Sequence, residues 1–256
     1  MSKVRNLMWF LKRPYLMPQV WYLFLRKFRP GIVAMDSTGD EAVRWCEQHE
    51  VDMATAYRNL TKQEPPMPIQ DLYGDVFATA ERVTTACVFR MGGAGAVDML
   101  YWISEYLQAT RILETGVAYG WSSLAFLLSL KHRPEGVLVS VDMPYVGMDN
   151  DDHVGCAVPD SLRPQWTLLK TSDRQGIPAG LRKLGRLDIC HYDSDKSYQG
   201  RMWAYPRLWE ALRSGGIFVS DDIGDNVAFR EFCNSLKIEP IVFKYKGKFV
   251  GLMTKP

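Results

Sequence analysis

The sequence predicts an α/β protein built on a mostly parallel β-sheet, and three patterns support this fold class. From Arg111 onward, short apolar runs alternate with helical stretches, as expected when helices join parallel strands and cover both faces of a sheet. Only residues 246–248 separate the last two apolar runs, which is too short for a crossover helix and predicts an antiparallel hairpin. The residues before Arg111 show helical spacing instead.

The chain of 256 residues divides near residue 110. Residues 1–109 are predicted to form a basic arm and a helical N-terminal extension, and residues 110–256 the sheet domain. With 47% hydrophobic residues the chain can bury a sizeable core, which argues against wholesale disorder. Its five cysteines are widely spaced and form no CxxC pair, so we expect neither disulfides nor a zinc site, and a cytoplasmic location.

The first 31 residues form a basic, aromatic arm. They contain seven Lys and Arg residues, and no acid precedes Asp36, so the arm carries +7 and the rest of the chain 2 − 7 = −5. Because its cations interleave with Trp, Tyr and Phe, we expect the arm to lie on an anionic membrane surface or on a partner subunit, as in a homo-oligomer. Packing against its own sheet domain is the alternative. The small net charge of the chain gives no reason to expect a nucleic-acid partner.

Helices are expected between the arm and the sheet domain. Ser37 or Thr38 could cap a helix over residues 41–50, and residues 75–90 have apolar side chains at helical spacing. The glycine-rich residues 91–95 interrupt this pattern before another helix over residues 96–107.

Seven strands are predicted in the sheet domain: Arg111–Glu114, Val137–Asp142, Thr167–Lys170, Leu187–Asp193, Gly216–Ser220, Pro240–Tyr245 and Val250–Thr254. Helices are predicted in most of the gaps: Trp121–Leu130, Pro178–Leu184, Tyr198–Leu212 and Val227–Leu236. Ligands of open parallel sheets bind beyond the carboxyl ends of the strands. The residues that follow each strand are therefore the candidates for function.

A glycine-containing turn follows the first strand. Glu114 ends that strand, and Gly116 and Gly120 would let the chain turn tightly and let a ligand approach the backbone. In a dinucleotide-binding GxGxxG turn, the middle glycine would stand at the position of Ala118. Its absence disfavours a nicotinamide cofactor. The second strand ends at Asp142, where a carboxylate can accept hydrogen bonds from ribose hydroxyls. An ordinary turn or helix cap is the simpler alternative.

This pattern of Glu, Gly and Gly resembles motif I of the class I S-adenosylmethionine-dependent methyltransferases, which have a Rossmann-like sheet. The resemblance implies S-adenosylmethionine as cofactor, bound by Glu114, Gly116, Gly120, Ser122, Asp142, Met143, Ser172 and Asp173. Ser172 and Asp173 could equally form a simple turn after the third strand.

Three aspartates follow the fourth and fifth predicted strands. Asp193 ends the fourth, and Asp221 and Asp222 follow the fifth. If these strands are neighbours, their ends lie roughly 5 Å apart. Two carboxylates about 4 Å apart would repel each other by roughly 4 kcal/mol at an effective dielectric constant near 20. A hard divalent cation such as Mg²⁺ would remove this repulsion, whereas caps of helices or turns are the structural alternative.

The stretches DSDKSY (193–198) and GGIFVSDD (215–222) resemble those of metal-dependent O-methyltransferases, both the catechol type and the type that modifies antibiotic sugars. The resemblance extends from about Gly92 to the C-terminus. It implies that Asp193, Asp221 and Asp222 bind Mg²⁺ and that Lys196 or Asp195 contacts the reacting hydroxyl. Asp222 departs from the Asn usual in the catechol type, which favours a small-molecule or glycan acceptor with a sugar hydroxyl.

Two histidines were considered as further site residues. His153 lies in an acidic segment that could form a substrate loop, and it is a candidate base, whereas His191 lies within a strand and is expected in the core. Two other functions stay open at this point. One is a metal-independent methyltransferase acting on a phenolic or natural-product molecule, and the other is a non-catalytic adaptor that docks through the basic arm.

Overall fold

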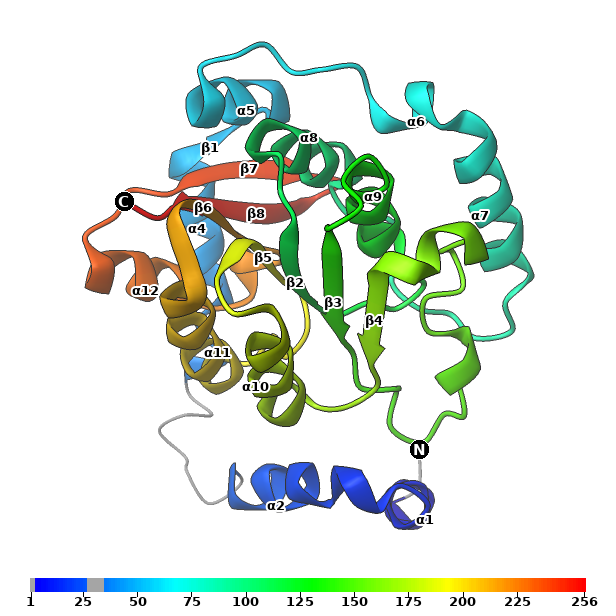
Figure 1. Ribbon diagram of the computed structural model, residues 1–256. Coiled ribbons are helices and arrows are strands. Elements are labelled where there is room, and N and C mark those ends of the chain that lie inside the picture. Colours follow the sequence, from blue (N-terminus) through cyan, green and yellow to red (C-terminus); the bar gives the residue numbers. More distant parts are fainter. Residues whose placement is uncertain (1–2, 27–34) are drawn as a thin grey trace.

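The computed structural model describes residues 3–26 and 35–256, and it confirms the predicted α/β architecture (Figure 1). One eight-stranded sheet has the strand order β1-β7-β8-β6-β5-β2-β3-β4. Neighbouring strands run parallel except where β8 pairs with β6 and with β7. The reversed strand expected from the C-terminal hairpin is therefore β8.

The predicted strands all form, with ends that differ by a few residues. The strands are β1 (Glu50–Val51), β2 (Arg111–Thr115), β3 (Val137–Val141), β4 (Trp166–Leu169), β5 (Leu187–Tyr192), β6 (Leu212–Ser220), β7 (Ile241–Tyr245) and β8 (Lys248–Thr254). Only β1 was not predicted, because two residues show no alternation. It pairs with β7 through Glu50 and Val242, so the N-terminal extension contributes an edge strand to the same sheet.

The helices also follow the predicted order. They are α1 (Lys3–Leu11), α2 (Met17–Arg26), α4 (Gly39–His49), α5 (Met53–Thr61), α6 (Ile69–Leu72), α7 (Gly74–Ala86), α8 (Val97–Leu107), α9 (Trp121–Leu130), α10 (Asp173–Leu184), α11 (Tyr198–Ala211) and α12 (Ala228–Leu236). Four short 3₁₀ segments accompany them: η1 (Pro14–Leu16), η2 (Asp151–His153), η3 (Asp160–Gln165) and η4 (Ile223–Asp225).

Two predicted helix ends and one predicted helix cap differ from the structure. The helix predicted over 75–90 ends at Ala86, and the one predicted from Pro178 begins at Asp173, so Pro178 lies inside α10. A Cβ at Gly176 of α10 would collide with Val141, so packing close to the sheet holds this helix despite the proline. Thr38 precedes α4 but does not cap it, because its hydroxyl donates to the Met35 carbonyl oxygen at 2.7 Å.

The core lies on both faces of the sheet because side chains alternate along each strand. Ile112 of β2 belongs to the core on the face covered by α8 and α9, together with Leu100 and Phe126. Leu113, the next residue, belongs to the opposite core, formed with α10 to α12. Both faces of β2 are therefore buried, as expected for an interior strand. Its parallel pairing with β3 and β5 places the carboxyl ends of the three strands at the same edge of the sheet.

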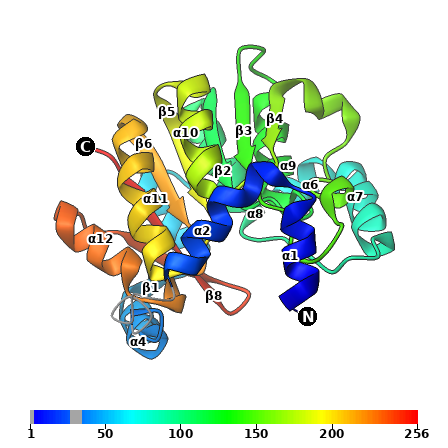
Figure 2. The same ribbon diagram turned by 90° about the horizontal axis from the view of Figure 1, so that it is seen from below.

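The basic arm packs against its own domain, which was the alternative to an interface. Figures 1 and 2 show α1 and α2 lying across the side of the molecule where β3 and β4 end. Trp9, Phe10 and Leu16 are buried there against Met143 and Val146. The Trp9 indole donates to the Met148 carbonyl oxygen at 2.5 Å, and Arg13 pairs with Asp151 at 2.6 Å. Residues 1–2 and 27–31 of the predicted arm lie outside the described residues.

No helix in the described parts of the chain is long and apolar enough to cross a membrane.

Candidate functional site

A cavity of about 780 Å³ opens at the carboxyl ends of the parallel strands. Its volume lies within the usual range for cofactor-sized ligands. The residues predicted as site residues that line it are Gly116, Ser122, Asp142, Met143, Ser172, Asp173, Asp193, Asp195, Lys196 and Asp221. The glycine turn and the acidic stretches, which are far apart in the sequence, therefore share one cavity.

The turn after β2 requires glycine. Gly116 has a φ of +79°, and a Cβ at this position would collide with the carbonyl oxygen of Asp193. The two segments are also tied together by a hydrogen bond of 3.0 Å from the Asp193 amide to the Thr115 carbonyl oxygen. A side chain at position 116 would force the turn and the acidic site apart.

Asp142 lies at the end of β3 and faces this turn. Its Oδ2 accepts a hydrogen bond of 2.9 Å from the amide of Ala118, which adopts a left-handed conformation with a φ of +49°. Burial raises the pKa of Asp142 to about 7. The carboxylate lines the cavity at the position predicted for recognition of ribose hydroxyls.

Glu114 and Gly120 lie on the side of the turn away from the cavity and do not line it. Glu114 is fully buried, and its Oε2 accepts hydrogen bonds from Ser123 at 2.5 Å and Ser140 at 2.7 Å. Gly120 has a φ of +92° and precedes α9, where a Cβ would crowd the Gly155 backbone. The cofactor contact predicted for these two residues stays a prediction, and in this structure both lie behind the residues that line the cavity.

Asp173 begins α10 at the other end of the cavity. Its Oδ2 accepts hydrogen bonds from Ser194 at 2.6 Å and from Tyr192 at 3.1 Å. Burial raises the pKa of Asp173 to about 6. Ser172 stands at the N-cap of α10, and its hydroxyl donates to the Gln175 side chain at 3.3 Å instead of capping a backbone amide.

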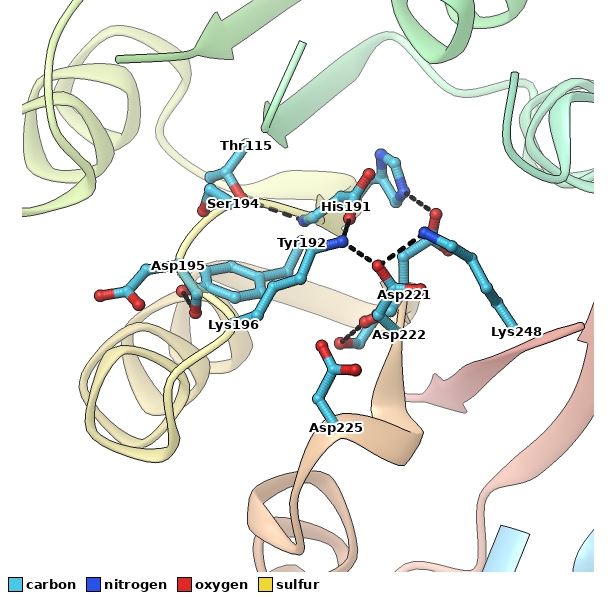
Figure 3. A network of polar contacts seen from close by, with 12 residues as sticks. Thr115, His191, Tyr192, Ser194, Asp195, Lys196, Asp221, Asp222, Asp225 and Lys248 are labelled. Atoms are coloured by element: carbon cyan, nitrogen blue, oxygen red, sulfur yellow. Dashed lines mark hydrogen bonds and ion pairs between the residues drawn. The ribbon is translucent and has the colours of Figure 1, made fainter. Parts of the chain in front are cut away.

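The predicted metal ligands lie beside two lysines at the ends of β5 and β6, and Figure 3 shows Asp221 and Asp222 together with Lys196 and Lys248. The Lys196 ammonium group pairs with Asp193 at 3.1 Å and also with Asp222. Lys248, from the β7–β8 hairpin, pairs with the same Asp222 oxygen at 3.0 Å. Within residues 3–26 and 35–256, no group of three or more His, Cys, Asp or Glu side chains is arranged to hold a metal ion.

His191 forms the inner side of this cluster. It is buried between Glu114, at 3.6 Å from Nδ1, and Asp221, at 3.8 Å from Nε2. Burial would lower the pKa of His191, but the carboxylates of Asp221 and Glu114 raise it to about 10, so the imidazole is charged. The sequence correctly predicted a buried residue but not a fixed positive charge between the cofactor turn and the acidic cluster.

The negative charge of the cluster is only partly offset. Burial and the neighbouring Asp221 raise the pKa of Asp193, although Lys196 and His191 act in the opposite direction. Asp222 adopts a left-handed backbone conformation with a φ of +53°, which an aspartate tolerates better than most residues. This conformation brings the Asp222 carboxylate against both lysines.

The two other candidate bases lie differently. Figure 3 shows the Asp195 carboxylate apart from the pair formed by Lys196 and Asp222, and its Oδ1 accepts from the Ser197 amide at 3.1 Å. His153 does not line the cavity, because its ring packs beside Phe89 with the ring centres 5.2 Å apart. The structure thus brings Lys196, but not His153, to the acidic cluster.

Several residues of the site escaped the sequence analysis. Lys248 reaches the cluster from a hairpin, and Gln19 and Tyr22 of α2 line the cavity. Arg201 of α11 is fully buried and donates to the carbonyl oxygen of Asp222 at 2.7 Å. None of them belongs to a motif, and each acquires its position only when distant elements pack together.

Comparison with known proteins agrees with this geometry. Residues 113–223, which span the turn and both acidic stretches, match a family model described as a methyltransferase domain. No curated protein matches the chain by sequence.

Solved structures share the fold at low sequence identity. Cofactor-bound Rv0187 from MTB superposes with a TM-score of 0.56 and 16% identity, covering 75% of this chain and 99% of that one. The O-methyltransferase from Bacillus cereus in complex with SAH superposes with a TM-score of 0.56 and 13% sequence identity, and the match covers 82% of this chain and 100% of that one. TomG from Streptomyces achromogenes is an O-methyltransferase involved in tomaymycin synthesis, solved in complex with SAM. It superposes with a TM-score of 0.53 and 17% sequence identity, and the match covers 74% of this chain and 97% of that one. The chain therefore has the Rossmann-like methyltransferase fold.

Replacing Arg201 by Met should destabilise the protein. The change removes two hydrogen bonds from a buried guanidinium to the carbonyl oxygens of Asp221 and Asp222, although the Asp225 amide still donates to Asp222, and we expect the free energy of unfolding to fall by about 2–3 kcal/mol. Urea denaturation measures this change. Arg207→Met on the exposed side of the same helix is the matched control, with an expected loss below about 1 kcal/mol. Equal losses in the two variants would contradict a supporting role for Arg201.

Proposed function

We propose that this protein is an S-adenosylmethionine-dependent O-methyltransferase. One observation carries the proposal: the glycine turn, Asp142 and the Asp193, Asp221 and Lys196 side of the acidic cluster line a single cavity of cofactor size, and Asp222 lies behind this wall. The match of residues 113–223 to a methyltransferase domain supports the cofactor, and the solved structures supply the fold. The charged and well-defined cluster argues against the alternative of a non-catalytic adaptor.

The reaction is a single displacement. The acceptor oxygen bonds to the methyl carbon as the methyl–sulfur bond breaks, S-adenosylhomocysteine leaves, and the hydroxyl proton passes to a base. No covalent enzyme nucleophile is needed, so the protein acts mainly by positioning two reactants. The turn at Gly116 and Asp142 would hold the cofactor, while the cluster at the ends of β5 and β6 would hold the acceptor hydroxyl.

Lys196 is the group that we assign to the acceptor oxygen. Its ammonium group lies among the carboxylates at the cavity wall, where it can donate a hydrogen bond to an oxygen that gains negative charge. It can itself take the proton only after it has become a neutral amine. Asp195 is already a carboxylate and needs no such change, but it lies apart from the cluster.

The donor set is also chemically suited to Mg²⁺. Asp193, Asp221 and Asp222 offer hard oxygen ligands, and burial together with the neighbouring Asp221 carboxylate raises the pKa of Asp193. Mg²⁺ held by these three residues would acidify the acceptor hydroxyl. Binding requires the ammonium groups of Lys196 and Lys248 to move off Asp222.

The acceptor is proposed to be a sugar hydroxyl on a small molecule or glycan. Asp195 and Asp222 support this choice, since they resemble the sugar-modifying branch more than the catechol branch. A phenolic or natural-product acceptor is the alternative, and a panel of glycans and catechols distinguishes them. Methylation of catechols with no reaction on glycans would reverse the assignment.

Cofactor binding provides the first test. The chain should bind S-adenosylhomocysteine but not NAD in isothermal titration calorimetry. Asp142→Ala should weaken binding by about tenfold or more, because hydrogen bonds from the ribose to a charged acceptor are lost. Binding of NAD without binding of S-adenosylhomocysteine would refute the proposed function.

The same binding should depend on pH. Because the pKa of Asp142 is about 7, its carboxylate is mostly protonated at pH 6 and mostly ionised at pH 8, so affinity should rise between these values. Asp142→Asn keeps the shape but cannot ionise, and it should remove most of this dependence. A pH profile that is unchanged in Asp142→Asn would assign the effect to another group.

Metal dependence is tested by chelation. We expect EDTA to abolish methyl transfer and added Mg²⁺ to restore it, whereas Asp193→Asn should remain folded and inactive at normal Mg²⁺ concentrations. Turnover that is indifferent to chelators would contradict the metal and would mean that Lys196 and Lys248 stay paired with Asp222 in the working enzyme, as they are in this structure.

Substitution of the lysine separates the two candidate bases. Lys196→Met should abolish turnover while leaving the affinity for S-adenosylhomocysteine unchanged, and Lys248 still pairs with Asp222 to limit any loss of stability. Asp195→Asn should retain measurable turnover. An active Lys196→Met variant beside an inactive Asp195→Asn variant would exchange the two roles.

A further inference from the structure

The outer face of the N-terminal arm is apolar and exposed. Among the described residues, five of the eleven large apolar side chains that are exposed lie between residues 8 and 24: Met8, Leu11, Tyr15, Trp21 and Phe24, each 48–63% exposed. They follow one another at intervals of three to six residues, and the exposed Pro18 falls between Tyr15 and Trp21. Such a concentration on a short segment marks a surface that contacts something else.

The inner face of the same segment packs against the sheet domain. Trp9 and Leu16 are buried against the sheet domain, and Arg13 is held by Asp149 at 3.3 Å and Asp151 at 2.6 Å. The Gln175 amide donates to the Tyr15 carbonyl oxygen at 2.8 Å, and the Arg174 guanidinium lies 3.8 Å from the centre of the Tyr22 ring. These contacts hold the inner face of the arm against the sheet domain. The exposed apolar side chains lie on the opposite face, which points away from this domain.

The charge of the arm indicates what that face contacts. Residues 3–26 contain five Lys and Arg residues and no acid, within an arm of 31 residues that carries +7, whereas the rest of the chain carries −5. Lys12 is exposed beside Leu11, so positive charge and apolar surface occur together. Aromatic side chains interleaved with cations are typical of helices that lie in the headgroup region of an anionic bilayer.

We propose that residues 3–26 form an interfacial membrane anchor, in which the outer face of α1 and α2 lies on an anionic lipid surface. Figure 2 shows both helices on one side of the molecule, so they can meet a flat surface together. Tyr22 and Gln19, on the inner side of α2, line the cavity. The anchor would therefore set the cavity next to the membrane surface.

Vesicle sedimentation with the full chain tests this proposal. The protein should pellet with vesicles of phosphatidylcholine and phosphatidylglycerol, much less with phosphatidylcholine alone, and less as NaCl is raised, because salt screens the attraction. The double variant Leu11→Ser/Trp21→Ser should bind about tenfold or more weakly. Leu72→Ser/Val88→Ser removes exposed apolar side chains elsewhere and should bind like the wild type.

Circular dichroism of each variant, which does not depend on the proposed activity, confirms that it is folded. Absence of binding to any vesicle, or equal binding by the two double variants, would overturn the proposal. Light scattering measures whether the chain is a monomer or a dimer. A dimer that Leu11→Ser/Trp21→Ser dissociates, without binding to vesicles, would assign this face to a second copy of the chain and would also overturn it.

Discussion

The close approach of two loops at the carboxyl edge of the sheet determines how the rest of the site is arranged. Gly116 touches the backbone of Asp193 so closely that a side chain at position 116 would not fit. Because β2 and β5 are neighbours, this contact joins the beginning of the glycine turn to the beginning of the acidic segment. The proposed methyl donor and acceptor sites are adjacent for this reason, and a single displacement between them needs no large movement.

Charge balance is the second constraint on this region. Glu114, Asp193, Asp221 and Asp222 lie near His191, Lys196 and Lys248, so opposite charges alternate from the buried core to the cavity wall. His191 remains charged in a buried position because two carboxylates flank it. An uncompensated charge of either sign would be costly there, so each carboxylate of the cluster lies close to a cation.

The N-terminal arm has two distinct faces. Arg13 and Trp9 tie its inner face to the sheet domain, and its outer face exposes apolar side chains and Lys12. The two expectations for this segment, packing on its own domain and contact with another surface, are compatible because they concern opposite sides of the same helices. A membrane contact made through α2 would act directly on a wall of the cavity.

The sequence by itself determined the strand order along the chain, the hairpin and the two segments that carry the site. These features depend on local patterns: alternation of apolar runs, the glycines around Ala118, and acids that follow strands. The roles of Lys248, Arg201 and His191, and the supporting position of Glu114, were decided only by the tertiary structure. Each depends on a contact between residues far apart in the chain, such as the 3.0 Å pair between Lys248 and Asp222, and no local pattern records which distant side chains will meet.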